Sequence, residues 1–155
     1  TRGRIDALLS ANGNRTVDSF HRELGHLMWD HCGMERTAEG LEKALDRLPA
    51  LREEFWRDVK VVGTGNRLNQ ELEKAGRVAD FIELGEVMIL DALDRRESAG
   101  AHFRNEYATE AGEAKRNDGD WCAVSAWETR PDGTKVRHSE PLSFSLIDLQ
   151  VRDYR

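Results

Sequence analysis

Apolar residues recur every three or four positions through the first 97 residues, and this spacing predicts amphipathic helices. A short helix is expected around Ile5 to Leu9, ending before Gly13. The next helix should begin after Thr16, a good N-cap residue, and stop at Gly33. Its apolar face is formed by Val17, Phe20, Leu24, Leu27 and Met28.

A second long helix is predicted after Thr37, although Gly40 stands where a capping box would have an acid or an amide. Pro49 lies inside this helix and is expected to kink or split it, because proline lacks the backbone donor. Gly63 and Gly65 mark the following turn. The apolar stripe consists of Leu41, Ala44, Leu45, Leu48, Leu51, Phe55 and Val59.

The third and longest helix is predicted from about Asn66 to Arg96. Its apolar positions follow a coiled-coil-like spacing of four, three, four and three at Leu68, Leu72, Ala75, Ala79 and Ile82. Three long amphipathic helices with short connections predict a mainly α fold. We expect residues 1–104 to form an antiparallel three-helix bundle of the spectrin-repeat type.

Residues 105–155 are expected to form an extended tail with short β-strands. Trp121 to Trp127 reads as a strand after the polar turn Asn117 to Asp120, and Pro131 to Gly133 is a turn signal before a returning strand at Lys135 to His138. A further extended pattern alternates Leu142, Phe144 and Leu146 with serines. Such a tail is too small for its own core, so it should pack on the bundle or on an absent partner.

The composition narrows the classes of function. The 155 residues contain 23 Lys and Arg against 29 Asp and Glu, a formal charge of −6, and no basic stripe that would favour nucleic acid. No apolar run reaches the roughly 18 residues of a transmembrane helix. Cys32 and Cys122 are too few for a disulfide framework. With no signal-peptide pattern after Thr1, these features indicate a cytoplasmic protein with reduced thiols.

Two apparent cofactor motifs fail on spacing. His21, His26 and His31 are five residues apart, which turns successive side chains about 140° away from each other on a helix. The sequence Gly63-Thr64-Gly65 lacks the third glycine of a dinucleotide loop, since Leu68 stands there, and is better explained as a turn between helices. We therefore expect no catalytic, cofactor-binding or metal-binding residue in this chain.

The end of the longest helix has a distinct composition. Glu97, Ser98, His102 and Arg104 can each anchor hydrogen bonds, and small residues at 99–101 would let another backbone approach. These features predict a domain-docking corner in which Arg104 is exposed when the partner is absent. A plain helix cap followed by a turn is the alternative.

This segment, Glu97-Ser98-Ala99-Gly100-Ala101-His102-Phe103-Arg104, resembles a motif of the succinate dehydrogenase and fumarate reductase flavoprotein subunits, near their C-terminus. The resemblance extends over about residues 17–155. It includes Asn69 to Glu73, Leu84 to Leu93, Asp118 to Trp127 and the closing Asp153-Tyr154-Arg155. Ala99 departs from the motif, which often has arginine there, so the role of that arginine does not carry over.

The resemblance implies that the chain is the C-terminal part of a larger flavoprotein subunit. In that family FAD and the dicarboxylate bind upstream, hydride moves between the dicarboxylate and FAD, and electrons pass to an iron-sulfur subunit. The expected partners are the flavin-binding domain of the same subunit, the iron-sulfur subunit and, indirectly, membrane-anchor subunits at the inner face of the cell membrane. The isolated fragment should be inactive. A stand-alone helical interaction module of the spectrin-repeat type is the alternative.

Overall fold

A computed structural model describes residues 2–150, and the closing Asp153-Tyr154-Arg155 lies outside them. The chain divides into two compact units, Thr1–Arg116 and Asn117–Arg155, so the boundary falls beyond the one expected at 104/105. The first unit contains α1 (Arg2–Ala11), β1 (Arg15–Thr16), α2 (Val17–Cys32), β2 (Glu35–Arg36), α3 (Ala38–Asp58), β3 (Val59–Lys60), α4 (Gln70–Asp94), β4 (Phe103–Arg104) and a 3-10 turn (Asn105–Tyr107). The second contains α5 (Asp118–Trp121), β5 (Ala123–Thr129) and β6 (Lys135–Pro141).

Side-chain caps set where the three long helices begin. Thr16 Oγ1 accepts a hydrogen bond from the Ser19 N–H at 3.2 Å, and Thr37 Oγ1 accepts one from Gly40 at 3.1 Å, which confirms both predicted N-caps. The third cap is Asn69, whose Oδ1 accepts from Leu72 at 3.1 Å. The predicted start at Asn66 is therefore wrong, and Leu68 lies outside the helix with 92% of its surface exposed.

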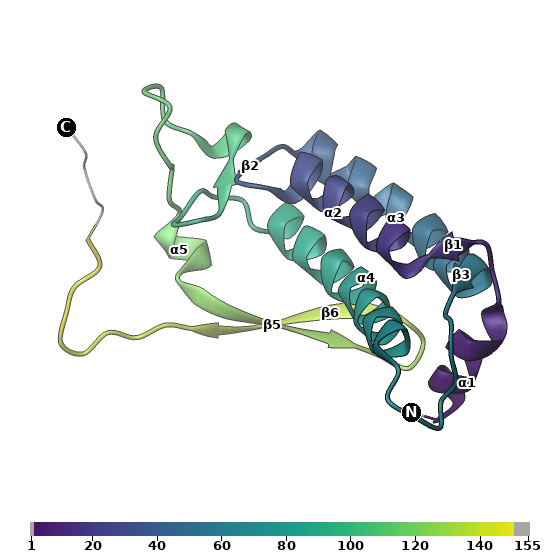
Figure 1. Cartoon of the computed structure of the whole chain (residues 1–155). Coiled ribbons are helices and arrows are strands. Elements are labelled where there is room, and N and C mark those ends of the chain that lie inside the picture. The colour runs from purple at the N-terminus through teal and green to yellow at the C-terminus, as the bar shows by residue number, and fades with distance from the viewer. Residues whose placement is uncertain (1, 151–155) are drawn as a thin grey trace. The chain divides into compact units, whose positions relative to one another are not determined.

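Two short parallel pairings fix the directions of the long helices (Figure 1). β1, which precedes α2, pairs with β3, which follows α3, so these helices run antiparallel. β2, between α2 and α3, pairs with β4 beyond α4, so α4 returns in the direction of α2. Each of the three helices packs against the other two, and α1 packs against α3 and α4. The mainly helical prediction is confirmed, and the short helix expected around Ile5 to Leu9 is α1. α5 and the short pairings of β1 with β3 and of β2 with β4 were not predicted.

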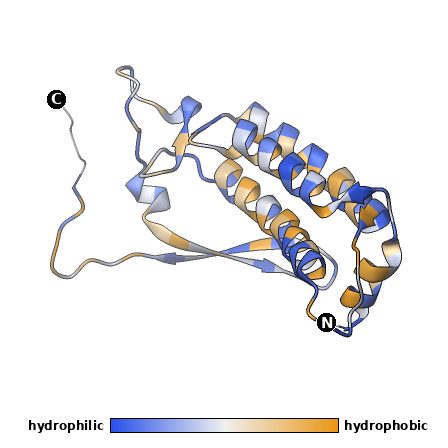
Figure 2. Cartoon of the chain, viewed as in Figure 1, coloured by the Kyte–Doolittle hydropathy of each residue, from blue (hydrophilic) through white to orange (hydrophobic). Residues whose placement is uncertain are grey.

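The core of the first unit lies between these helices. Figure 2 shows apolar residues interspersed with polar ones along α2, α3 and α4, as expected for helices that bury one face. At its centre the rings of Phe20 and Phe55 meet edge to face with centroids 5.3 Å apart. The largest fully buried apolar side chains are those of Phe20, Phe55, Leu8, Leu41, Leu48, Leu51, Ile82, Ile89, Val17 and Val59.

Pro49 neither splits α3 nor ends it, since the helix is continuous from Ala38 to Asp58. The proline lies on the exposed face of the helix, where water can bond the carbonyl that has lost its donor. Leu48 and Leu51 on either side are fully buried and hold both halves of the helix against the core. The predicted split is therefore wrong because packing outweighs one missing backbone bond.

Four charged side chains link β1, α2 and α3 at the edge of this core. Arg15 contacts Glu23 at 2.7 Å and Glu54 at 3.1 Å, and Arg47 contacts the same two carboxylates. All four side chains are about one-third exposed, between 30% and 35%. Burial alone would raise the pKa of Glu23, but hydrogen bonds from Arg15 and Arg47 outweigh it and lower this pKa below its ordinary value.

The lowered pKa of Glu23 predicts a loss of stability in acid. The unfolded chain takes up this proton at higher pH than the folded one, so the stabilisation is complete above the ordinary glutamate pKa of about 4.3 and is lost as pH falls through the folded pKa. Glu23→Gln should show a smaller loss than the unaltered chain when urea unfolding is compared at neutral and acid pH. The control Glu53→Gln, an exposed position on α3, should keep the full pH dependence. An equal decrease in the free energy of unfolding from neutral to acid pH for the unaltered chain and Glu23→Gln would contradict the prediction.

The second unit is an antiparallel hairpin, which confirms the predicted pair of strands. The register runs from Ala123 opposite Pro141 to Thr129 opposite Lys135, and Gly133 takes φ +88° in the turn. Trp121 belongs to α5 rather than to the strand. Residues 142–150 form no strand, and the extended pattern predicted there contributes the Leu142 N–H, which donates to the Cys122 carbonyl at 2.9 Å. Neither unit contains, within residues 2–150, a helix long and apolar enough to cross a membrane.

Candidate functional site

The segment after α4 folds into a tight turn rather than continuing the helix. α4 ends at Asp94, and Ala99 and His102 exchange backbone hydrogen bonds of 2.8 and 3.0 Å. Gly100 has φ +58°, while Ala101 keeps a negative φ, the combination found in a type II′ turn. A β-carbon on Gly100 would meet no atom within 4 Å, so the backbone conformation and not crowding accounts for this glycine.

Ser98 and Glu97 fasten this turn from inside. The Ser98 hydroxyl accepts from the Arg104 N–H at 2.8 Å and donates to the Arg104 carbonyl at 3.1 Å, and the Ser98 N–H donates to Lys115. Glu97 receives two N–H groups of Arg95, at 2.6 and 2.9 Å, on one carboxylate oxygen. Ser98 is fully buried and Glu97 is 2% exposed, so both act within the first unit.

Arg104 joins the ends of two long helices. Its Nη1 donates to the carbonyls of Ala92 at 2.8 Å and Leu93 at 3.1 Å, which belong to the last turn of α4. Its Nε donates to Glu106 at 3.0 Å, and the other oxygen of Glu106 accepts from the Ala38 N–H at 2.6 Å. A cation therefore meets the C-terminus of α4 and an anion meets the N-terminus of α3, which is the favourable arrangement for both helix dipoles.

His102 is held between two arginines as a neutral ring. Arg36 Nη1 can only donate, so His102 Nδ1 accepts its hydrogen bond at 2.8 Å. His102 Nε2 must then carry the proton and donate to the Arg95 carbonyl at 3.1 Å. Burial lowers the pKa of His102, and the charges of Arg36, Arg95 and Arg104 lower it further. The ring is thus an uncharged link between β2 and the end of α4.

A hollow of about 210 Å³ opens beside this ring. It lies where β2, the end of α2 and the last turns of α4 come together. No group of three or more histidine, cysteine, aspartate or glutamate residues that could hold a metal ion occurs within residues 2–150. The hollow is lined by Cys32, Arg36, Met88, Asp91, Ala92, Arg95 and His102.

All four residues predicted for the docking corner lie in one place. The expectation that Arg104 would be exposed is wrong, because it is 3% exposed and bonded within the chain. His102 alone among the four is half-buried and lines the hollow. Arg36 and Glu106 were missed by the sequence analysis, since they are brought to the corner by the β2–β4 pairing and by a turn that the pattern did not predict.

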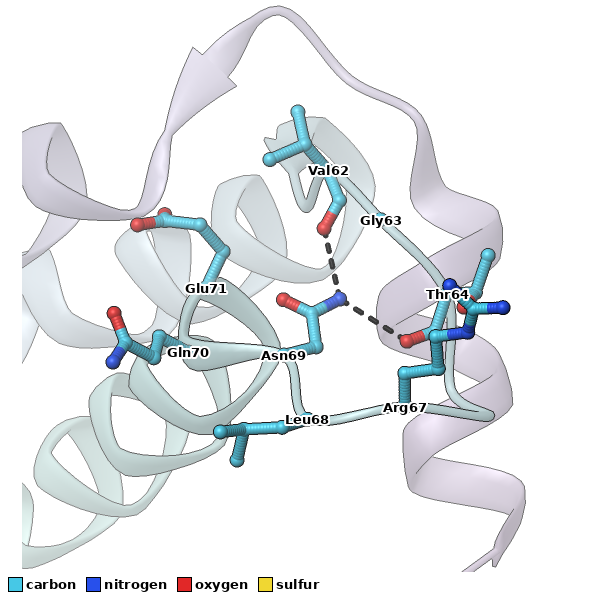
Figure 3. A pocket seen from close by; sticks show the side chains of 8 residues that line it. All are labelled: Val62, Gly63, Thr64, Arg67, Leu68, Asn69, Gln70 and Glu71. Atoms are coloured by element: carbon cyan, nitrogen blue, oxygen red, sulfur yellow. Dashed lines mark hydrogen bonds between the residues drawn. The ribbon is translucent and has the colours of Figure 1, made fainter.

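A second hollow, of about 520 Å³, surrounds the turn between β3 and α4 (Figure 3). Figure 3 shows Asn69 directed at the loop, where its Nδ2 donates to the carbonyls of Val62 at 2.8 Å and Thr64 at 3.3 Å. Gly63 has φ +93° in this turn. The Gly63-Thr64-Gly65 sequence thus connects two elements of the first unit, as predicted.

The family model and the curated relatives of this chain belong to one family. A family model described as fumarate reductase flavoprotein C-term matches residues 21–154. The succinate dehydrogenase flavoprotein subunit of Rickettsia felis is 30% identical over 148 residues, covering 96% of this chain and 24% of the relative. The fumarate reductase flavoprotein subunit of Escherichia coli is 32% identical over 101 residues, which are 65% of this chain and 17% of the relative.

A solved structure shares the fold. An E. coli quinol fumarate reductase chain superposes with a TM-score of 0.79 and 26% identity, covering 95% of this chain and 24% of that chain. The chain therefore spans about a quarter of the length of the relatives that match nearly all of it. From the match to residues 21–154 and these likenesses, the chain belongs to the family of C-terminal domains of succinate dehydrogenase and fumarate reductase flavoprotein subunits.

Proposed function

We propose that this domain belongs to the flavoprotein subunit of a succinate:quinone oxidoreductase, which interconverts succinate and fumarate and passes electrons through FAD to an iron-sulfur subunit. The observation that carries the proposal is the family match over residues 21–154, in a chain that spans 24% of a succinate dehydrogenase relative. FAD would be bound by the remainder of the subunit. The domain itself would scaffold and dock rather than catalyse.

The corner formed by Glu97, Ser98, His102 and Arg104 is the proposed docking region. Its hydrogen bonds hold the ends of α3 and α4 together, so that a rigid surface meets the flavin-binding domain. The hairpin unit would pack on the bundle or on that domain. The proposed assembly includes an iron-sulfur subunit and membrane-anchor subunits, which would place the protein on the cytoplasmic face of the cell membrane.

A stand-alone interaction module of the spectrin-repeat type is the second candidate. The mutual packing of α2, α3 and α4 in alternating directions favours it. The corner weighs against it, because a three-helix repeat does not need Arg104 and Glu106 to join the ends of α3 and α4.

The test is to express the complete open reading frame that contains this chain, with its neighbouring subunit genes. Purified enzyme should contain flavin and reduce a dye with succinate, or oxidise a reduced dye with fumarate. The ratio of the two rates would give the preferred direction. A complete reading frame without a flavin-binding segment, together with no dicarboxylate-dependent dye reaction, would refute the proposal and favour the interaction module.

The chain of 155 residues by itself is expected to bind no FAD, because its one glycine-rich segment lacks the dinucleotide fingerprint. Titration with FAD, followed by flavin fluorescence quenching and gel filtration, should give no co-eluting flavin. Stoichiometric tight binding would show that the flavin site lies in this domain.

A further inference from the structure

Arg36 is held in place by two hydrogen bonds and lacks a carboxylate partner. Its Nε donates to the Gly33 carbonyl at 2.8 Å and its Nη1 donates to His102 at 2.8 Å. The β2–β4 pairing fixes its backbone opposite Arg104. Within residues 2–150 it forms no ion pair, and since guanidinium has five N–H donors, several remain for another acceptor.

Other arginines with restricted exposure in the first unit behave differently. Five of them contact at least one carboxylate, as expected for a cation that has lost part of its hydration. Arg36 is also half-buried, yet its neighbour is a neutral imidazole that accepts one hydrogen bond and supplies no charge. The arginines with carboxylate partners are Arg15, Arg47, Arg52, Arg95 and Arg104.

The surface beside Arg36 combines this cation with exposed apolar side chains. The 210 Å³ hollow is lined by Arg36 and by Met88, which is 47% exposed. Leu84 and Phe81 lie four and seven residues before Met88 on α4, on the same side of the helix, and are 53% and 41% exposed. Arg36, Arg95 and Asp91 are the charged residues that line the hollow, and Arg95 is already paired with Glu97. Arg36 is therefore the lining cation that can offer N–H groups to an anion.

We propose that this hollow receives a carboxylate side chain from the flavin-bearing remainder of the same polypeptide, with apolar neighbours of that carboxylate on Met88, Leu84 and Phe81. The inference rests on the proposed function and names the partner group for its docking corner. A planar guanidinium with two donors already fixed presents the rest in a defined orientation, which suits a carboxylate. A covalently linked partner needs only a small contact of this mixed kind, because the linkage keeps its effective concentration high.

The experiment uses the complete subunit with Arg36→Lys, which keeps the charge and introduces an amine at the site. A carbodiimide activates a nearby carboxylate, the amine attacks it, and an amide forms as the carbodiimide leaves as its urea. Mass spectrometry of the digested subunit then identifies the joined peptides. Arg57→Lys is the matched control, since Arg57 is an exposed arginine in the last turn of α3.

We expect Arg36→Lys to give at least about tenfold more amide cross-links to peptides upstream of this domain than Arg57→Lys, because the docked carboxylate has a high effective concentration. Cross-links only to Asp91 or other residues of this chain, to a second copy or to another subunit would overturn the inference, and so would no cross-link. Competition by free succinate that abolishes the upstream cross-link without dissociating the domain would assign the hollow to a small dicarboxylate and also overturn it. Flavin content and dye reduction are measured on the same samples. An enzyme that holds flavin and reduces the dye but gives no upstream cross-link overturns this inference alone, whereas lack of both in the unaltered enzyme refutes the proposed function.

Discussion

Replacing Phe55 with alanine is expected to destabilise the first unit by about 3–5 kcal/mol, the usual cost of removing a buried aromatic ring. Phe55 is completely buried in the last turn of α3, and its ring meets Phe20 edge to face at 5.3 Å and Trp56 at 5.5 Å. Its removal loses the transfer free energy of the ring and leaves a cavity between three helices. Urea unfolding followed by helical circular dichroism would measure the change.

Phe81→Ala is the matched control for this measurement. Phe81 is 41% exposed on α4 and contacts the His21 ring at 5.9 Å, so its loss should cost no more than about 1 kcal/mol. Similar losses for the two variants would mean that the core does not lie between α2, α3 and α4 as described.

Replacing Arg104 with alanine is the second large effect, with an expected loss of about 3 kcal/mol. The change removes the donor to the buried end of α4 and the charge beside Glu106, whose other oxygen bonds Ala38. Arg104 is 3% exposed, so water replaces these bonds poorly. The measurement is the urea midpoint of the isolated domain, at a pH where Glu106 is ionised.

Two further variants make this prediction specific. Arg57→Ala removes the same charge from an exposed position and should change stability by no more than about 0.5 kcal/mol. Arg104→Lys should recover only part of the loss, since a single ammonium group cannot serve the α4 carbonyls and Glu106 with the same geometry. A loss below about 0.5 kcal/mol for Arg104→Ala would show that the corner is not an internal brace.

The helices could be predicted from the sequence because their signals are local. Thr16 and Thr37 cap the helices that follow them. Most residues of the apolar stripe predicted for the second long helix are buried. Leu68 misled the prediction because its spacing from Leu72 fits a helix, while the Asn69 side chain caps the helix one residue later. Periodicity cannot distinguish an apolar residue before a cap from one inside the helix.

The candidate site was only partly predictable, because its geometry depends on contacts between segments that are distant in the sequence. Glu97, Ser98 and Arg104 attract attention because polar groups cluster around a glycine, yet their burial depends on contacts that the local sequence does not encode. Arg36 gave no signal, since an isolated arginine after a helix is ordinary. It reaches His102 only because β2 pairs with β4, although α3 and α4 separate the two strands in the sequence.

The bond between Glu106 and Ala38 spans 68 residues, and this has a consequence for how the protein is made. A ribosome completes α2, α3 and α4 before it releases the residues that join their ends. Closing a loop of this length costs about 4 kcal/mol of chain entropy. Packing of the three helices already brings the two segments close together, so most of this cost arises before the bond forms. Within the first unit the corner therefore closes last, and we expect a chain truncated before residue 103 to retain its helices while the end of α4 stays open to solvent. In such a chain the Ala92 and Leu93 carbonyls lose the guanidinium that bonds them in the complete domain.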